Sequence, residues 1–86
     1  MSNIIVYSTA YCPYCVRAKQ LLERKDVEYQ EIMVDRDPNL MQEMMERSQR
    51  RTVPQIFIGD QSIGGYDELA HLDAKGELDS LLGFDM

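Results

Sequence analysis

The apolar positions of the chain alternate between short strand-like runs and helix-like stripes. Residues 3–8 form a β-branched and aromatic run that predicts a buried strand. From residue 13 to about 25 apolar side chains recur at helical spacing, which predicts a first helix. Residues 27–34 carry apolar side chains among acids and end in a turn-rich sequence, and we interpret them as a second strand.

A second helix is predicted from Pro38 to about residue 49, because Asp37 suits the N-cap and proline suits the first helical position. Its apolar stripe is rich in methionine. Such a face could bind partners or soft metals, but methionine is also a flexible gap filler, and we favour packing in the core. The stripe consists of Leu40, Met41, Met44 and Met45.

The rest of the chain predicts a hairpin and two short helices. Residues 54–58 and 61–63 flank Gly59-Asp60, a pattern typical of a β-hairpin. Glycines then separate the remaining elements. We expect helices at about 67–74 and 77–82, with Gly76 and Gly83 as their C-terminal caps.

This order of elements predicts an α/β fold. A parallel strand pair joined by a crossover helix, followed by an antiparallel hairpin, makes a four-stranded mixed sheet with helices on both faces. The chain has 86 residues without a linker or an internal repeat, so we expect one domain over residues 1–86.

Composition and charge exclude several classes of function. The hydrophobic content of 44% and charged content of 28% are typical of a soluble globular protein. Apolar runs are short, and no basic segment precedes a long apolar one at the N-terminus, so we expect neither a membrane span nor a secretory signal. We therefore expect a cytoplasmic protein. The net charge of −6 argues against nucleic acid or an anionic membrane as a partner.

The only two cysteines, Cys12 and Cys15, stand between the first predicted strand and the first predicted helix. Free N–H groups and the macrodipole at a helix start favour a thiolate. A structural disulfide here would close a tiny loop and stabilise little. Zinc needs four ligands, and only His71, which we expect on the surface, adds a further soft one. Two ordinary buried cysteines remain an alternative, but we favour a redox pair without a metal.

Three segments, in this order and across nearly the whole chain, resemble those of dithiol glutaredoxins of the small bacterial kind. Cys-x-x-Cys alone is shared with thioredoxins, whereas the Pro-Tyr filling and the other two segments separate glutaredoxins from them. The resemblance implies the thioredoxin fold and glutathione-dependent disulfide reduction, with glutathione as co-substrate. The segments are Cys12-Pro13-Tyr14-Cys15, Thr52-Val53-Pro54 and Gly64-Gly65-Tyr66-Asp67.

In this chemistry Cys12, exposed at the helix start, is expected to be the nucleophile, and Cys15, half buried, the resolving thiol. Attack on a substrate disulfide leaves a mixed disulfide on Cys12. Either Cys15 displaces the product, which is the dithiol route, or glutathione does, which is the monothiol route. The expected partners are disulfide-containing or glutathionylated proteins, with ribonucleotide reductase as one candidate, and we expect a monomer.

Glutathione carries two carboxylates and one ammonium group, so its pocket should combine cations, backbone donors and an acid. Arg47, Arg50 and Arg51 are a third of the nine Lys and Arg side chains and precede Thr52 closely. For each of them a solvated helix end is an equally good explanation, and we select Arg51 as the ligand contact.

The resemblance also implies that the Val53 backbone pairs with the cysteine of glutathione and that Pro54 is cis. A helix start at residues 66–67 offers N–H groups to the γ-glutamyl carboxylate, and Asp67 could hold the ammonium group or simply stabilise the helix. The predicted ligand contacts are Tyr14, Arg51, Thr52, Val53, Pro54, Gly65, Tyr66 and Asp67.

The chain departs from the family pattern at two positions. Thr9 stands where many glutaredoxins have lysine, which removes one carboxylate contact and one charge near the thiolate. Tyr66 stands where close relatives often have cysteine.

Two alternative functions remain open at this point. One is a dimer that bridges an iron–sulfur cluster through Cys12 of each chain and two glutathiones. The proline after Cys12 and the second thiol argue against it. The other is a glutaredoxin-like electron donor that thioredoxin reductase reduces.

Overall fold

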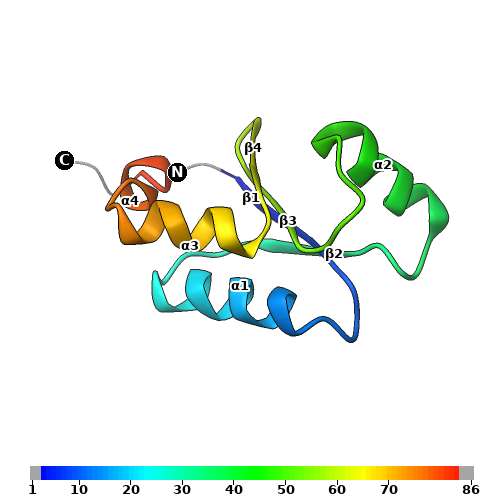
Figure 1. Ribbon diagram of the computed structural model, residues 1–86, viewed down its shortest axis with the longest axis horizontal. Coiled ribbons are helices and arrows are strands. Elements are labelled where there is room, and N and C mark those ends of the chain that lie inside the picture. Colours follow the sequence, from blue (N-terminus) through cyan, green and yellow to red (C-terminus); the bar gives the residue numbers. More distant parts are fainter. Residues whose placement is uncertain (1–2, 84–86) are drawn as a thin grey trace.

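The computed structural model describes residues 3–83, which form a four-stranded mixed sheet with helices on both faces (Figure 1). The spatial order is β2-β1-β3-β4, with β1 parallel to β2 and antiparallel to β3, and β4 antiparallel to β3. The strands are Ile4–Ser8 (β1), Gln30–Met33 (β2), Gln55–Ile58 (β3) and Gln61–Gly64 (β4). The helices are Pro13–Arg24 (α1), Pro38–Ser48 (α2), Tyr66–Ala74 (α3) and Leu78–Leu81 (α4). The predicted order and types of elements are confirmed.

Strand β1 begins one residue later than the sequence predicts, and the later starts of β2 and β3 have causes in their backbone hydrogen bonding. After α1, Asp26 turns the chain with φ of 61°, and the Val27 N–H bonds back to the Leu22 carbonyl, so pairing of β2 starts only where Gln30 lies opposite Ile5. Strand β3 begins after Pro54, which has no N–H to give to a sheet. Both differences therefore arise from hydrogen bonds that the apolar pattern does not reveal.

The sheet has a core on each face. Helices α1 and α3 cover one face, where they pack with Val6 and Ile56, and α2 covers the other (Figure 1). On that second face the ring of Tyr7 meets the ring of Phe57 edge-on at 5.7 Å between centroids. Met44 of α2 is fully buried against them, which confirms the packing role of the methionine stripe.

The register of the strands brings three loops to one edge of the sheet. Tyr7, near the end of β1, lies opposite Gln55, the first residue of β3. Ile56 in turn lies opposite Gly64, the last residue of β4. The start of α1, the loop before β3 and the start of α3 therefore converge there.

The C-terminal end of α3 confirms the predicted role of Gly76. With φ of 75° Gly76 donates its N–H to the Asp73 carbonyl at 3.1 Å, and Glu77 donates to the Leu72 carbonyl at 2.9 Å. These two bonds satisfy carbonyl groups that a helix end otherwise leaves free. None of the helices in residues 3–83 has the length and apolar character that a membrane crossing requires.

Candidate functional site

The start of α1 positions the two cysteines. Cys12 is the N-cap in extended conformation, Pro13 follows as the first helical residue, and the Cys12 sulfur accepts the Cys15 N–H at 3.1 Å. A disulfide joins the two residues, whose Cα atoms are 5.2 Å apart. Cys12 is partly buried rather than exposed, and Cys15 is fully buried rather than half buried, because it belongs to the apolar stripe of α1. Only Cys12 can therefore meet a substrate from solvent.

The loop before β3 forms the second side of the site. The Val53–Pro54 peptide bond is cis, as the resemblance implied, and the Val53 carbonyl oxygen lies 3.8 Å from the Cys12 sulfur. The buried Gln55 holds this loop in place, since its Nε2 donates to the carbonyl and hydroxyl oxygens of Thr52 at 2.9 and 3.2 Å. Sequence reasoning did not single out Gln55. The sequence feature that could have pointed to it is a glutamine at the start of an otherwise apolar strand.

The turn from β4 into α3 forms the third side. Gly64 has φ of 111°, and Gly65 is the N-cap of α3. The Gly65 N–H donates to Oε1 of Glu68 at 2.6 Å, so the third residue of the helix caps its own first turn. Asp67, in that same turn, is exposed.

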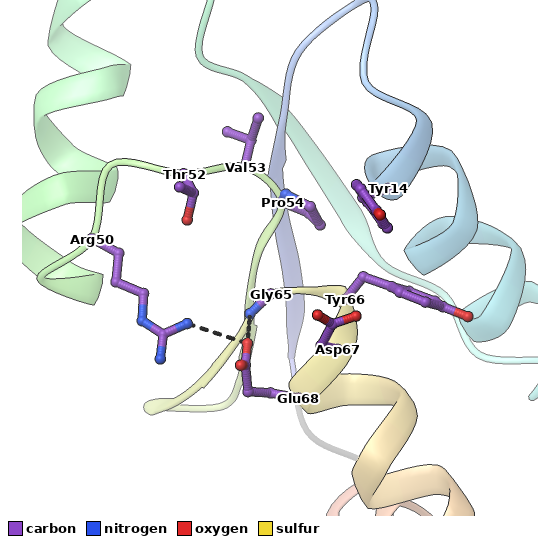
Figure 2. Close-up of a pocket in the computed structure, with 9 residues that line it drawn as sticks. All are labelled: Tyr14, Arg50, Thr52, Val53, Pro54, Gly65, Tyr66, Asp67 and Glu68. Atoms are coloured by element: carbon purple, nitrogen blue, oxygen red, sulfur yellow. Dashed lines mark hydrogen bonds and ion pairs between the residues drawn. The ribbon is translucent and has the colours of Figure 1, made fainter.

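A cavity of about 240 Å³ lies between these three segments. Figure 2 shows Tyr14 and Tyr66 on one side of it and Arg50 on the other. The two tyrosine rings are 6.2 Å apart between centroids. The lining residues are Tyr14, Arg50, Thr52, Val53, Pro54, Gly65, Tyr66, Asp67 and Glu68. All the predicted ligand contacts except Arg51 are thus brought together.

Arg50, and not Arg51, supplies the cation of the cavity. Helix α2 ends at Ser48, and the left-handed conformation of its C-cap Gln49, with φ of 63°, turns the chain. Arg50 then reaches across to Glu68, with its Nη1 3.2 Å from Oε1, whereas Arg51 does not line the cavity and borders, together with Arg50, a second hollow beside Gln49. Arg47 is engaged elsewhere: its Nη1 donates to the Tyr7 hydroxyl at 2.6 Å.

Glu68 is the lining residue that sequence reasoning missed. The hydrogen bond from the Gly65 N–H, and secondly the nearby Arg50 guanidinium, hold the pKa of Glu68 below its ordinary value. A carboxylate therefore faces the cavity. The sequence feature that could have pointed to Glu68 is a glutamate in the first turn of a predicted helix, where it can act as the acid of a capping box.

His71 is exposed on α3, as expected. Within the part of the chain that the structure describes, no three His, Cys, Asp or Glu side chains come together in an arrangement that could hold a metal ion.

Comparison with known proteins identifies the family. The model of the glutaredoxin family matches residues 4–63. A glutaredoxin of Pseudomonas aeruginosa is 50% identical over 82 residues, which cover 95% of this chain and 98% of that protein. Glutaredoxin 3 of Escherichia coli K12 is 52% identical over 82 residues, which cover 95% of this chain and 99% of that protein. The chain belongs to the glutaredoxin family.

Solved structures agree with this glutaredoxin in fold. A crystal structure of a buckwheat glutaredoxin–glutathione complex has a TM-score of 0.87 at 32% identity and covers 95% of this chain and 77% of that one. The solution structure of a glutaredoxin from Brucella melitensis has a TM-score of 0.85 at 52% identity and covers 95% and 89%. The thioredoxin fold that the resemblance implied is confirmed.

Glutaredoxins are glutathione-dependent thiol-disulfide oxidoreductases, and this is the activity of the present glutaredoxin. The geometry of the site suits it. The Cys12 sulfur at the helix N-cap accepts the Cys15 N–H, a contact that stabilises a thiolate, and the second sulfur within disulfide reach can complete an exchange.

Proposed function

We propose that this glutaredoxin binds glutathione in the cavity beside Tyr14 and reduces disulfides with Cys12 as nucleophile and Cys15 as resolving thiol. One observation carries the proposal: Cys12, the partly exposed sulfur at the N-cap of α1, lies 3.8 Å from the Val53 carbonyl at the rim of that cavity. A thiol of a ligand paired with the Val53 backbone would lie next to this sulfur.

The reaction proceeds by two thiol–disulfide exchanges. The Cys12 thiolate attacks one sulfur of a substrate disulfide, and the other sulfur leaves as a thiolate that takes up a proton. In the dithiol route the Cys15 thiolate then attacks the Cys12 sulfur and releases the second substrate thiol. Two glutathione molecules reduce the resulting Cys12–Cys15 disulfide and become glutathione disulfide. In the monothiol route glutathione attacks the glutathione sulfur of the mixed disulfide directly and frees the Cys12 thiolate.

The charged groups of glutathione match the cavity. The free N–H groups at the start of α3 suit the γ-glutamyl carboxylate, and the exposed carboxylate of Asp67 suits the ammonium group. The guanidinium of Arg50 suits the glycine carboxylate, whereas the sequence had favoured Arg51 as the arginine in contact with the ligand. The similarity in fold to the buckwheat protein, solved as a glutathione complex, supports this placement.

The proposed substrates are protein disulfides and glutathionylated proteins, among which ribonucleotide reductase stays a candidate. Two exposed aromatic side chains support a polypeptide substrate, since Tyr11 is 98% and Tyr14 53% exposed beside Cys12. We propose further that the chain acts as a cytoplasmic monomer and forms a single domain. The two core clusters support the single domain, because they lie on the two faces of one sheet.

Two serine variants test the roles of the thiols. Cys12→Ser should abolish glutathione-dependent reduction of both a glutathionylated peptide and a protein disulfide such as those of insulin. Cys15→Ser should keep the first activity and lose most of the second, because only the dithiol route needs a resolving thiol. Both reactions are followed through NADPH consumption by glutathione reductase.

Replacing the reductant separates the proposed function from its alternative. With thioredoxin reductase in place of glutathione and glutathione reductase, the wild-type protein should be nearly inactive.

The two experiments have separate contrary outcomes. Equal losses in both assays for Cys12→Ser and Cys15→Ser would contradict the thiol assignment. Full activity of the wild type with thioredoxin reductase would contradict the dependence on glutathione.

A further inference from the structure

The Glu68 carboxylate lies between two donors that a ligand carboxylate would also seek. Its Oε1 accepts the Gly65 N–H at 2.6 Å and faces Nη1 of Arg50 at 3.2 Å, and both contacts are drawn in Figure 2. Among the described residues that line the cavity, Arg50 is the only lysine or arginine. The one basic side chain of the cavity is therefore already paired with an acid of the protein.

Neighbouring backbone shapes the place that Glu68 occupies. A Cβ atom at Gly64 would come within 2.7 Å of Oε1 of Glu68, so the side chain can fold over this turn only because residue 64 is glycine. The lowered pKa of Glu68 means that its negative charge is present at neutral pH. The turn at Gly64, the hydrogen bond from the Gly65 N–H and the ion pair with Arg50 together hold the Glu68 carboxylate in one position.

This arrangement has a consequence for anionic ligands. A carboxylate that approaches Arg50 meets a guanidinium whose charge Glu68 already balances, and it also meets the negative charge of Glu68 itself. From this geometry we infer that Glu68 is an internal competitor for Arg50 that sets the affinity and selectivity of the cavity for a ligand carboxylate. The inference rests on the proposed binding of glutathione, and it assigns to Glu68 a role beyond that of a helix cap.

The variant Glu68→Gln separates the charge from the cap, because a glutamine amide oxygen can still accept the Gly65 N–H. The probe is S-methylglutathione, which has no thiol and cannot exchange with Cys12. Its dissociation constant is measured by NMR titration of the backbone amides. We expect the variant to bind S-methylglutathione about two- to five-fold more tightly than the wild type, a size appropriate to an exposed ion pair.

Two controls identify the competition as one for Arg50. The first is the ethyl ester of S-methylglutathione on its glycine carboxylate, whose affinity should be the same for wild type and variant. The second is Arg50→Gln, in whose background Glu68→Gln should give a smaller gain, because only the repulsion between Glu68 and the ligand carboxylate is then removed. A helix cap alone would produce neither pattern.

Each outcome decides a separate point. Unchanged or weaker binding of S-methylglutathione by Glu68→Gln would overturn the role of Glu68 while the glutathione site stands. An equal gain for the ester, or an undiminished gain in the Arg50→Gln background, would overturn the competition for Arg50. Failure of the wild type itself to bind the probe at millimolar concentration would overturn both the inference and the proposed site.

Discussion

Arg50 and Arg51 are adjacent in sequence, yet only Arg50 lines the cavity between the three loops. After the left-handed turn at Gln49, Arg50 reaches across the cavity toward Glu68, and Arg51 borders a second hollow that Arg50 also lines. Charge alone therefore cannot tell which arginine serves a ligand. The direction of the side chain after the end of α2 places Arg50, rather than Arg51, at the cavity.

The two arginines make a matched pair for mutation. Arg50→Ala should raise the KM for a glutathionylated peptide roughly three- to ten-fold, as expected for the loss of a charge-assisted hydrogen bond, with kcat little changed. Arg51→Ala, which removes the same charge nearby, should leave both constants close to wild type. Steady-state kinetics with saturating glutathione reductase measure both variants, and a KM effect of Arg51→Ala equal to that of Arg50→Ala would refute the assignment.

Two glycines with positive φ define the ends of α3. Gly64, with φ of 111°, connects β4 to the helix, and Gly76, with φ of 75°, ends it. A Cβ at Gly76 would meet nothing within 4 Å, whereas one at Gly64 would approach Oε1 of Glu68. Replacement by alanine therefore tests backbone strain alone at Gly76. At Gly64 it tests backbone strain together with the loss of the Glu68 cap.

We expect Gly76→Ala to lower the free energy of unfolding by about 1–2 kcal/mol, the cost of a left-handed backbone at a residue with a Cβ. Gly64→Ala should cost about 1 kcal/mol more, because Glu68 must leave the Gly65 N–H and a helix cap is lost. Urea unfolding followed by circular dichroism gives both values. Equal costs at the two glycines would mean that Glu68 adds nothing to the stability of α3.

At the scale of the whole molecule, Glu31 connects three elements on the face that α1 covers. Its Oε2 accepts a hydrogen bond from Nζ of Lys19, in α1, at 2.7 Å. It accepts a second from the hydroxyl of the buried Ser8, in β1, at 2.6 Å. The Lys19 ammonium first, and the Ser8 hydroxyl second, lower the pKa of Glu31 from its ordinary value of 4.5. The folded protein therefore binds a proton at Glu31 less readily than the unfolded chain does.

The linkage between proton binding and folding gives the sign of the pH dependence of stability. A depressed carboxyl pKa contributes stability that is complete above the unfolded value and disappears as pH falls through the folded value. Wild type should thus be more stable than Glu31→Gln at pH values well above 4.5, and the difference should shrink as pH falls below 4.5 and through the lower pKa of the folded protein. Urea unfolding of both proteins across this pH range measures it, and a difference that is constant with pH would show that the ionised carboxylate is not its source.

What the sequence determined by itself was local and periodic. The apolar spacing predicted the order of strands and helices, because a strand and a helix bury their faces with different periods. The placement of Cys12 and Cys15 at the start of a helix followed from the short segment around them. The resemblance carried by the motifs also predicted the cis bond before Pro54, which periodicity alone would have left trans.

Only the tertiary structure decided which distant side chains meet. Glu68 and Arg50 are 18 residues apart in the chain, and no local pattern indicates that they pair across the cavity. The buried Gln55 likewise shows its role only when it holds the loop at Thr52. Local sequence restricts backbone angles strongly, but side-chain partners across a cavity depend on the strand register and the loop turns, which the packed sheet sets as a whole.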